Sequence, residues 1–333
     1  AVSTEFKLNS ISVIEIQENG VPRLDYTNGT ASILLENQST NLLTYSNDFS
    51  QSVWNKQSGV TATYNTTETL SPDGTYNATK LIGNGTTGIF TSLFVSGVVS
   101  RSIYIKSVTG NVNVILKDPQ NTVTQKTLNV TTQWQRFELV EDNTISSQGI
   151  WVDDIPSSGI YIYGAQLEAQ SFSTSLIHTS GSTVTRAAET LNNAGNSDLI
   201  NSTEGVLYAE FKPIALDSYW KRITLSDGTS TNRIILGIDN ANNLTATVFD
   251  GSNQAVLGGS YSGIENMQKY ALKFKENDFA LWVNGLEIAT DTSGNTFPTD
   301  TLSELNLDST TIEPFYGKVK CVAVFKEALT DEE

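Results

Sequence analysis

The sequence is poor in cysteine, histidine and methionine, with one of each in 333 residues. A disulfide needs two thiols, so no bridge can form within the chain, and its stability must come from packing or from a metal. The only cysteine, Cys321, lies in the alternating run from Val319 to Phe325, where we expect it to be a buried, small hydrophobic residue. The only histidine, His178, excludes zinc sites built on a histidine pair and makes any Ser-His-Asp triad depend on one residue.

Long apolar runs and basic residues are also scarce. No run approaches the roughly 20 apolar residues that span a bilayer, so no membrane insertion is predicted. Lys plus Arg number 20 against 36 for Asp plus Glu, and a net charge of −16 repels phosphate backbones. Nucleic acid is therefore excluded as a partner. The carboxylate excess is compatible with Ca²⁺ binding, but solubility explains it equally simply.

The sequence is rich in short alternating runs separated by turn residues. Its 24 glycines and many Thr, Ser and Asn residues favour strands and tight turns over helices. In the run Gln133–Val140, for example, Phe137 and Leu139 alternate with Arg136 and Glu138, which gives a strand with one apolar and one wet face. The sequence predicts an all-β protein made of two antiparallel β-sandwiches, the first of jelly-roll type.

Turn residues and composition divide the chain into three units. Residues 1–45 carry Asn-Gly turns and alternating runs, including one over residues 10–16, and are predicted to form an N-terminal β-hairpin or strap. Residues 46–184 are predicted to form the jelly roll and residues 185–333 the second sandwich, with a boundary near 185. The Tyr-rich run Gly159–Glu168 is expected to be the last strand of the first sandwich, running into a Ser/Thr-rich connector.

Several motifs between residues 20 and 190 occur in a fixed order: Pro22-Arg-Leu-Asp-Tyr26, Thr40-Asn-Leu-Leu-Thr-Tyr-Ser-Asn-Asp-Phe49, Ser71-Pro-Asp-Gly74, Trp134-Gln-Arg-Phe137 and Tyr163-Gly-Ala-Gln-Leu-Glu168. Together they resemble the recurring pattern of phage tail-type virion proteins with a carbohydrate-binding-module-like jelly roll. The resemblance implies glycan binding, other virion proteins as partners, and a place in a virion tail or appendage or outside the cell.

The second half contains an Asn284-Gly285 turn inside the run Asp278–Ala289, and it closes with Phe325-Lys-Glu-Ala-Leu-Thr-Asp-Glu-Glu333. These stretches resemble laminin-G-like, concanavalin A-like lectin domains. The resemblance implies a second sandwich of lectin type.

Aromatic residues are the candidates for ligand binding. Alternation places Phe279, Leu281 and Val283 on one face of a strand, so Trp282 is expected on the opposite, outer face, where an indole can stack on a sugar ring. The alternative is that a loop or the other domain covers it. The further candidates are Trp151, Tyr161, Tyr163 and Trp220, of which Tyr161 and Tyr163 share the expected face of Ala165 and Leu167 and are equally well explained as core.

Asp48 and Glu168 are the candidate metal ligands. The resemblance implies this site, because carbohydrate-binding-module jelly rolls often hold a structural Ca²⁺ between their first and last strands. Two carboxylates fall short of the six to eight oxygens that Ca²⁺ prefers, so backbone carbonyls would have to complete the site.

Catalytic motifs are missing from the sequence. Neither the strand motifs of concanavalin A-like glycosidases, such as Glu-x-Asp-x-Glu, nor a Gly-x-Ser-x-Gly elbow nor a His-Glu-x-x-His helix occurs. We therefore predict a non-catalytic protein that recognises a glycan or polysaccharide on a host cell surface. The alternatives are a structural virion component that mediates assembly and oligomer contacts, a polysaccharide-cleaving enzyme or its accessory module, and a bacterial secreted adhesin.

Overall fold

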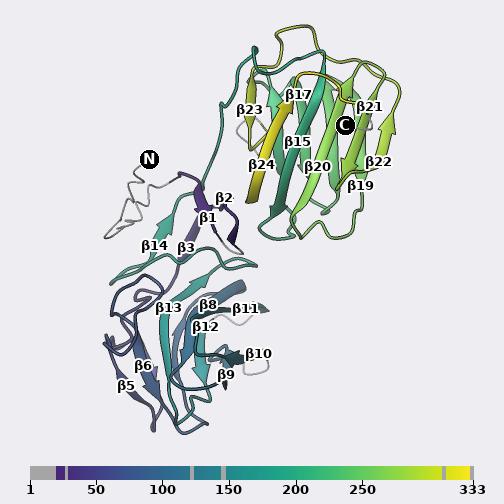
Figure 1. Ribbon diagram of the computed structural model, residues 1–333. Coiled ribbons are helices and arrows are strands. Elements are labelled where there is room, and N and C mark those ends of the chain that lie inside the picture. The colour runs from purple at the N-terminus through teal and green to yellow at the C-terminus, as the bar shows by residue number, and fades with distance from the viewer. Residues whose placement is uncertain (1–19, 27–28, 121–123, 144–147, 310–312, 331–333) are drawn as a thin grey trace, which may run out of the picture.

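The computed structural model describes residues 20–26, 29–120, 124–143, 148–309 and 313–330. Over these residues the chain forms β-strands and no α-helix, arranged in two lobes (Figure 1). Every ladder between neighbouring strands is antiparallel, as in the β9–β10 and β15–β20 pairs. The predicted all-β class is confirmed.

The first lobe is a sandwich of two five-stranded sheets, with strand orders β10-β9-β12-β7-β4 and β11-β8-β13-β6-β5. Side chains of Ile103, Ile162 and Val114 meet between the sheets in one apolar core. The bounds of these strands are β4 Asn55–Lys56, β5 Thr61–Thr63, β6 Thr79–Ile82, β7 Ile89–Leu93, β8 Gly97–Ser107, β9 Val112–Lys117, β10 Gln125–Val130, β11 Gln135–Asn143, β12 Gln148–Asp153 and β13 Ile160–Glu168.

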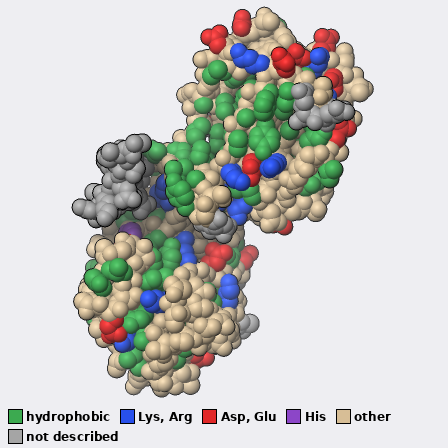
Figure 2. Space-filling view, viewed as in Figure 1, with side chains coloured by type: hydrophobic (Ala, Val, Ile, Leu, Met, Phe, Trp, Pro, Cys, Tyr) green, Lys and Arg blue, Asp and Glu red, His purple; other side chains and the backbone are tan. Residues whose placement is uncertain are grey.

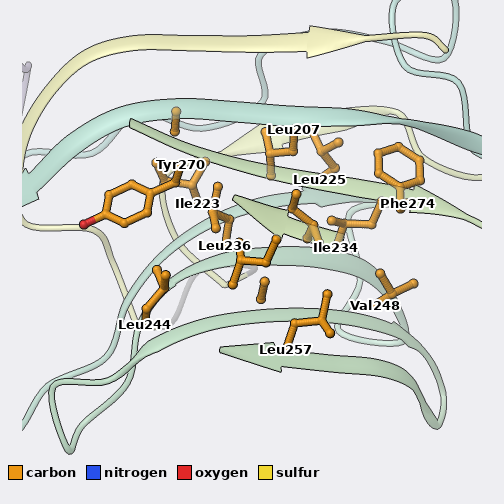
Figure 3. Packing of buried hydrophobic residues seen from close by; sticks show 14 of the residues in the cluster. Leu207, Ile223, Leu225, Ile234, Leu236, Leu244, Val248, Leu257, Tyr270 and Phe274 are labelled. Atoms are coloured by element: carbon orange, nitrogen blue, oxygen red, sulfur yellow. The ribbon is translucent and has the colours of Figure 1, made fainter. Parts of the chain in front are cut away.

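The second lobe is also a sandwich, built from a five-stranded sheet, β19-β18-β17-β16-β23, and a seven-stranded sheet, β1-β2-β24-β15-β20-β21-β22. Figure 3 shows its core, in which Leu207 and Phe274 of one sheet face Ile234 and Leu236 of the other. The bounds of these strands are β1 Arg23–Asp25, β2 Ser32–Leu35, β15 Glu204–Pro213, β16 Lys221–Ser226, β17 Asn232–Ile238, β18 Leu244–Asp250, β19 Asn253–Gly259, β20 Gln268–Lys275, β21 Phe279–Val283, β22 Leu286–Asp291, β23 Glu304–Asn306 and β24 Gly317–Phe325.

The Asn284-Gly285 turn joins β21 to β22 as predicted. Both residues have positive φ, 52° and 81°, which a two-residue hairpin turn of type I′ requires and which Asn and Gly tolerate best. The turn sets the register Val283↔Leu286 and so fixes which residues of β21 face outward.

The antiparallel pair β1 and β2 does not stand alone. β1 pairs with β2, and β2 continues the seven-stranded sheet of the second sandwich by pairing with β24, for instance Ile33 with Val319. β3 (Ser39–Asn41) then pairs with β14 (Val184–Arg186) beside the first sandwich. Residues 21–41 therefore run from one lobe to the other (Figure 1). The predicted strand over residues 10–16 lies outside the described residues.

A buried ion cluster marks this passage between the lobes. Arg23 donates from Nε to Glu189 at 2.5 Å and also pairs with Glu36. Arg186 pairs with Glu36 at 2.8 Å, and the backbone N–H of Glu36 donates to the Glu189 carboxylate at 2.7 Å. Buried carboxylates are stable only when they are paired and hydrogen-bonded, so the four side chains depend on one another.

Cys321 departs from its expected position. The β15–β24 ladder shifts register between Glu210 and Phe211, so that Lys320 and Cys321 are both exposed. The expectation of a buried Cys321 is wrong, because the extra residue of a bulge reverses which face the following side chains occupy.

Candidate functional site

Trp282 lies on the outer face of the seven-stranded sheet, as alternation predicts. Phe279, Leu281 and Val283 are buried in the core of the second sandwich, whereas the indole of Trp282 is half-buried on the opposite side. The ring is therefore partly exposed on the outer face of the sheet.

Register aligns Trp282 with three other residues across the sheet. Ala323 of β24 pairs with Tyr208 of β15, Tyr208 pairs with Ala271 of β20, and Ala271 pairs with Trp282 of β21. We call these four residues the aromatic row. Neighbouring strands are about 4.8 Å apart, so Tyr208 and Trp282 stand roughly 10 Å apart with only a methyl group between them. The result is a shallow apolar strip, and Figure 2 shows hydrophobic side chains gathered over this sheet.

Charged groups border the aromatic row. The ammonium group of Lys273 lies 5.4 Å from the centre of the Trp282 ring and 2.9 Å from Asp278. A cation at this distance from the face of an indole is attracted to it and restricts its orientation. On the other side, burial and the nearby carboxylate of Glu210 raise the pKa of Tyr208 above its ordinary value. An apolar strip with a polar border suits the alternating faces and hydroxyls of a sugar.

Trp151 sits on the outer face of the first sandwich, where a cation already covers it. Cross-strand pairing places Phe90 on one side of it and Lys117 on the other. The Lys117 ammonium is 3.9 Å from the ring centre and 2.5 Å from the Asp153 carboxylate. This ring face is in use within the protein, so Trp151 offers a ligand less surface than Trp282 does.

Tyr161 and Tyr163 lie on the outer face of their sheet and are covered by the loop of residues 64–78. Tyr161 donates to Glu68 and Tyr163 to Asp73, each at 2.9 Å, and both side chains are buried. Burial and the hydrogen bond to Glu68 raise the pKa of Tyr161 to about 12. Because the loop covers both rings, neither is exposed to a ligand.

The expected common face of Tyr161, Tyr163, Ala165 and Leu167 is wrong. The pairing of β13 with β8 shifts register between Tyr163 and Gln166, and Gly164 has a φ of 62°. Ala165 and Leu167 therefore point into the core while the two tyrosines point away from it.

Trp220 precedes β16 and is stacked with an arginine. The Arg222 guanidinium lies 4.1 Å from the centre of the half-buried Trp220 ring and 2.7 Å from Glu313. The site is on the five-stranded sheet of the second sandwich and is separate from the aromatic row.

Asp48 and Glu168 are occupied by different partners. The exposed Asp48 accepts hydrogen bonds from the Ser50 hydroxyl at 2.5 Å and from the Gln51 amide at 2.7 Å. Glu168 is fully buried and accepts from Ser39 at 2.6 Å and from the hydroxyl and backbone N–H of Thr174 at 2.5 and 3.0 Å. Within the described ranges no three His, Cys, Asp or Glu side chains gather as a metal site would need. A Ca²⁺ ion at Asp48 and Glu168 stays a prediction.

One open pocket of about 690 Å³ lies apart from these residues, at an edge of the second sandwich. Its lining is largely polar and includes Glu204, Lys275 and Glu276, of which Glu204 and Lys275 form an ion pair at 2.8 Å.

No helix in the described part of the chain is long and apolar enough to cross a membrane.

Sequence reasoning missed Tyr208 and Arg222. Tyr208 belongs to the alternating run Gly205–Phe211, so its outward direction could have been inferred from Leu207 and Ala209. Its position opposite Trp282 could not, because that depends on which strands pair.

Comparison with known proteins gives the fold of residues 187–333, which form most of the second sandwich. Residues 187–333 match the model of the concanavalin A-like lectin/glucanases superfamily. No curated protein matches the chain. The second sandwich is therefore a concanavalin A-like, laminin-G-like domain, and it contains the whole aromatic row.

Solved structures with some similarity include carbohydrate-binding modules and laminin. CBM40 of the Ruminococcus gnavus IT-sialidase, bound to α2,6-sialyllactose, is 21% identical, with 42% of this chain and 90% of that chain covered and a TM-score of 0.34. Domains LG4-5 of the mouse laminin α1 chain are 9% identical, with 84% and 96% covered and a TM-score of 0.29. The CBM22-1-CBM22-2 tandem domain of Paenibacillus barcinonensis Xyn10C is 11% identical, with 87% and 98% covered and a TM-score of 0.31.

Proposed function

We propose that this protein is a non-catalytic glycan-binding protein and that the aromatic row is its binding surface. The observation that carries the proposal is the pair Tyr208 and Trp282, which flanks Ala271 on the outer face of a domain matching the lectin superfamily. Stacking of aromatic faces on sugar rings supplies the affinity, and the charged border provides hydrogen bonds to hydroxyls.

Substitution of the two aromatic residues tests the site. We expect Trp282→Ala and Tyr208→Ala each to weaken binding to a glycan selected on a broad array by about tenfold, because each removes a ring at the centre of the surface. Melting temperatures should stay within a few degrees of the parent, since neither ring belongs to the core. Isothermal titration measures the affinity.

Tyr219→Ala is the matched control, because this tyrosine is 71% exposed and lies outside the row. Unchanged affinity in Trp282→Ala and Tyr208→Ala would show that binding takes place elsewhere, and equal losses in all three variants would show that the loss is not specific to the row. Unfolding of Trp282→Ala would show instead that the indole is structural. If the array gives no hit while the protein forms a defined oligomer in solution, an assembly role becomes the better explanation.

We further propose that the glycan lies on a host cell surface and that the protein is part of a phage tail or another virion appendage. Support comes from the ordered motifs between residues 20 and 190, such as Trp134-Gln-Arg-Phe137 and Tyr163-Gly-Ala-Gln-Leu-Glu168. Purified protein should adhere to a subset of a bacterial panel, and periodate oxidation of the cell-surface sugars should abolish adhesion. Adhesion that survives oxidation would point to a protein receptor.

A further inference from the structure

The second sandwich carries two arginines on the outer face of its other sheet. In β16 the side chains of Ile223 and Leu225 enter the core, and Arg222 points away from it. In β17 the side chain of Ile234 also enters the core, and that of Arg233 points away from it. The two arginines lie on neighbouring strands of one sheet, at opposite ends of the β16–β17 ladder.

Their side chains converge although their backbones are apart. Ser309 receives hydrogen bonds from Nη1 of Arg233 at 2.7 Å and from Nη1 of Arg222 at 3.3 Å. Each guanidinium also lies over an aromatic ring, Arg222 at 4.1 Å from the centre of Trp220 and Arg233 at 5.4 Å from that of Phe249. A single hydroxyl group thus gathers two cations between two aromatic rings.

This concentration of positive charge is only partly balanced. Arg222 pairs with Glu313, whereas Arg233 forms no ion pair within the described residues. Nε of both arginines is buried and has no hydrogen-bond partner there. Burial and the neighbouring charge of Arg233 lower the pKa of Arg222, with Glu313 opposing both effects. Although the chain has a net charge of −16, the two guanidinium groups here share one carboxylate, that of Glu313, so part of their positive charge and hydrogen-bonding capacity is left for a ligand.

We propose that Arg222 and Arg233 bind the anionic group of an acidic saccharide, a carboxylate or a sulfate ester. The proposal rests on the proposed glycan-binding function and extends it to a second surface with its own ligand class. Guanidinium groups are suited to this role because their planar fork matches the oxygen spacing of carboxylates and sulfates.

Three monosaccharides with the same ring test the ligand class: glucuronate, glucose 6-sulfate and glucose. We expect NMR titration of the intact protein to show binding of glucuronate, glucose 6-sulfate or both, at least about tenfold tighter than that of glucose, since a charge-assisted hydrogen bond is lost with the anion. Added salt should weaken only the anionic ligands. Comparison of glucuronate with glucose 6-sulfate shows whether the site prefers a carboxylate or a sulfate ester. Equal affinity for all three sugars would overturn the proposal.

Substitution locates the site. Arg233→Gln should weaken binding of the preferred anionic sugar by about tenfold, and Arg233→Lys should restore it only in part, because an ammonium group keeps the charge and loses the fork. The control is Arg136→Gln in the first sandwich. Arg136 also bonds to a serine hydroxyl, Ser102 at 2.8 Å, and also lies over a ring, Tyr104 at 5.6 Å, but has no second arginine beside it.

The outcomes separate this site from the aromatic row. Loss of anion binding in Arg233→Gln with unchanged binding of the array-selected glycan supports two independent surfaces. Anion binding that persists in both Arg233 variants, or that falls equally in Arg136→Gln, refutes the arginine site and leaves the aromatic row untouched. If Arg233→Gln melts well below the parent, the Arg233→Lys titration decides: an unchanged affinity there also refutes the proposal.

Discussion

At the scale of single residues, the most constrained side chain is Arg101 of β8. It is fully buried and pairs with Asp118 at 3.0 Å and Glu141 at 2.8 Å, and its Nε donates to the carbonyl oxygen of Gly149 at 2.7 Å. These partners come from or adjoin β9, β11 and β12, so one arginine connects both sheets of the first sandwich. The alternating run Arg101–Lys106 already puts Arg101 on the face of Ile103 and Ile105. A charge on an apolar face is the sequence signal of such a buried network.

Removing this arginine should destabilise the first sandwich strongly. We expect Arg101→Leu to lower the free energy of unfolding by about 3–5 kcal/mol, because Asp118 and Glu141 stay buried without their cation. Chemical denaturation monitored by tryptophan fluorescence measures the change. Arg136→Leu serves as control, since this outer-face arginine pairs with no carboxylate in the described chain, and it should cost at most about 1 kcal/mol. Similar losses in both variants would mean that the network is not what stabilises Arg101.

At the scale of elements, the loop of residues 64–78 is held on its sheet by tyrosine and tryptophan hydrogen bonds. Tyr161 and Tyr163 donate to Glu68 and Asp73, and the indole N–H of Trp134 donates to the Leu70 carbonyl at 2.8 Å. Both phenols must keep their protons to donate. The attachment of the loop therefore depends on pH.

Alkaline conditions should release this loop before the sandwich unfolds. The folded pKa of Tyr161, about 12, exceeds its ordinary value. The associated stability is therefore complete below about pH 10 and disappears as the pH rises from about 10 to 12. Melting temperature and proteolysis between residues 64 and 78, followed across this range, measure the effect. Tyr161→Phe should reduce the pH dependence, whereas the exposed Tyr76→Phe should not. A pH profile identical in all three proteins would contradict the assignment.

Alternation predicted correctly which side chains face the core where the strand itself has no extra residue, and it failed where the strand contains one. It placed Trp282 outside because the register shift beside this residue adds the extra residue to β22 (Ile288), whereas β21 pairs regularly with β20. It failed at Ala165 and at Cys321, because each follows a register shift that one extra residue produces. Nothing in the local sequence marks the β15–β24 shift, whereas Gly164, with its positive φ, is a visible sign of the other.

At the scale of the whole molecule, the segment of residues 21–41 ties the two sandwiches together. β2 extends the sheet of the second, and β3 lies beside the first, with the cluster of Arg23, Glu36, Arg186 and Glu189 between them. The hairpin itself was predictable from its turn residues. Its partner was not, because the pairing of Ile33 with Val319 joins distant parts of the chain that no local pattern relates.

Breaking the cluster should loosen the segment without unfolding either core. We expect Arg23→Met to lower the free energy of unfolding by about 1–3 kcal/mol, less than a fully buried arginine would, because Arg23 is partly exposed and Arg186 remains with the two carboxylates. Limited proteolysis should cut earlier within residues 21–41. Lys320→Met, which breaks an exposed pair with Glu210, is the control. Unchanged cleavage in Arg23→Met would show that strand pairing alone holds the segment.

The pairing of β2 with β24 also limits how early the second sandwich can fold during synthesis. Among the strands described, β2 is the second to be synthesised and its partner β24 the last. At about 5–20 residues per second, β2 must wait roughly 15–60 s for its neighbour to be made. The last strand of the first sandwich, β13, is synthesised long before β24, so the first sandwich can fold without waiting for the second. The seven-stranded sheet therefore cannot be completed until β24 has left the ribosome, so the β2–β24 ladder forms late and β2 stays without this partner until then.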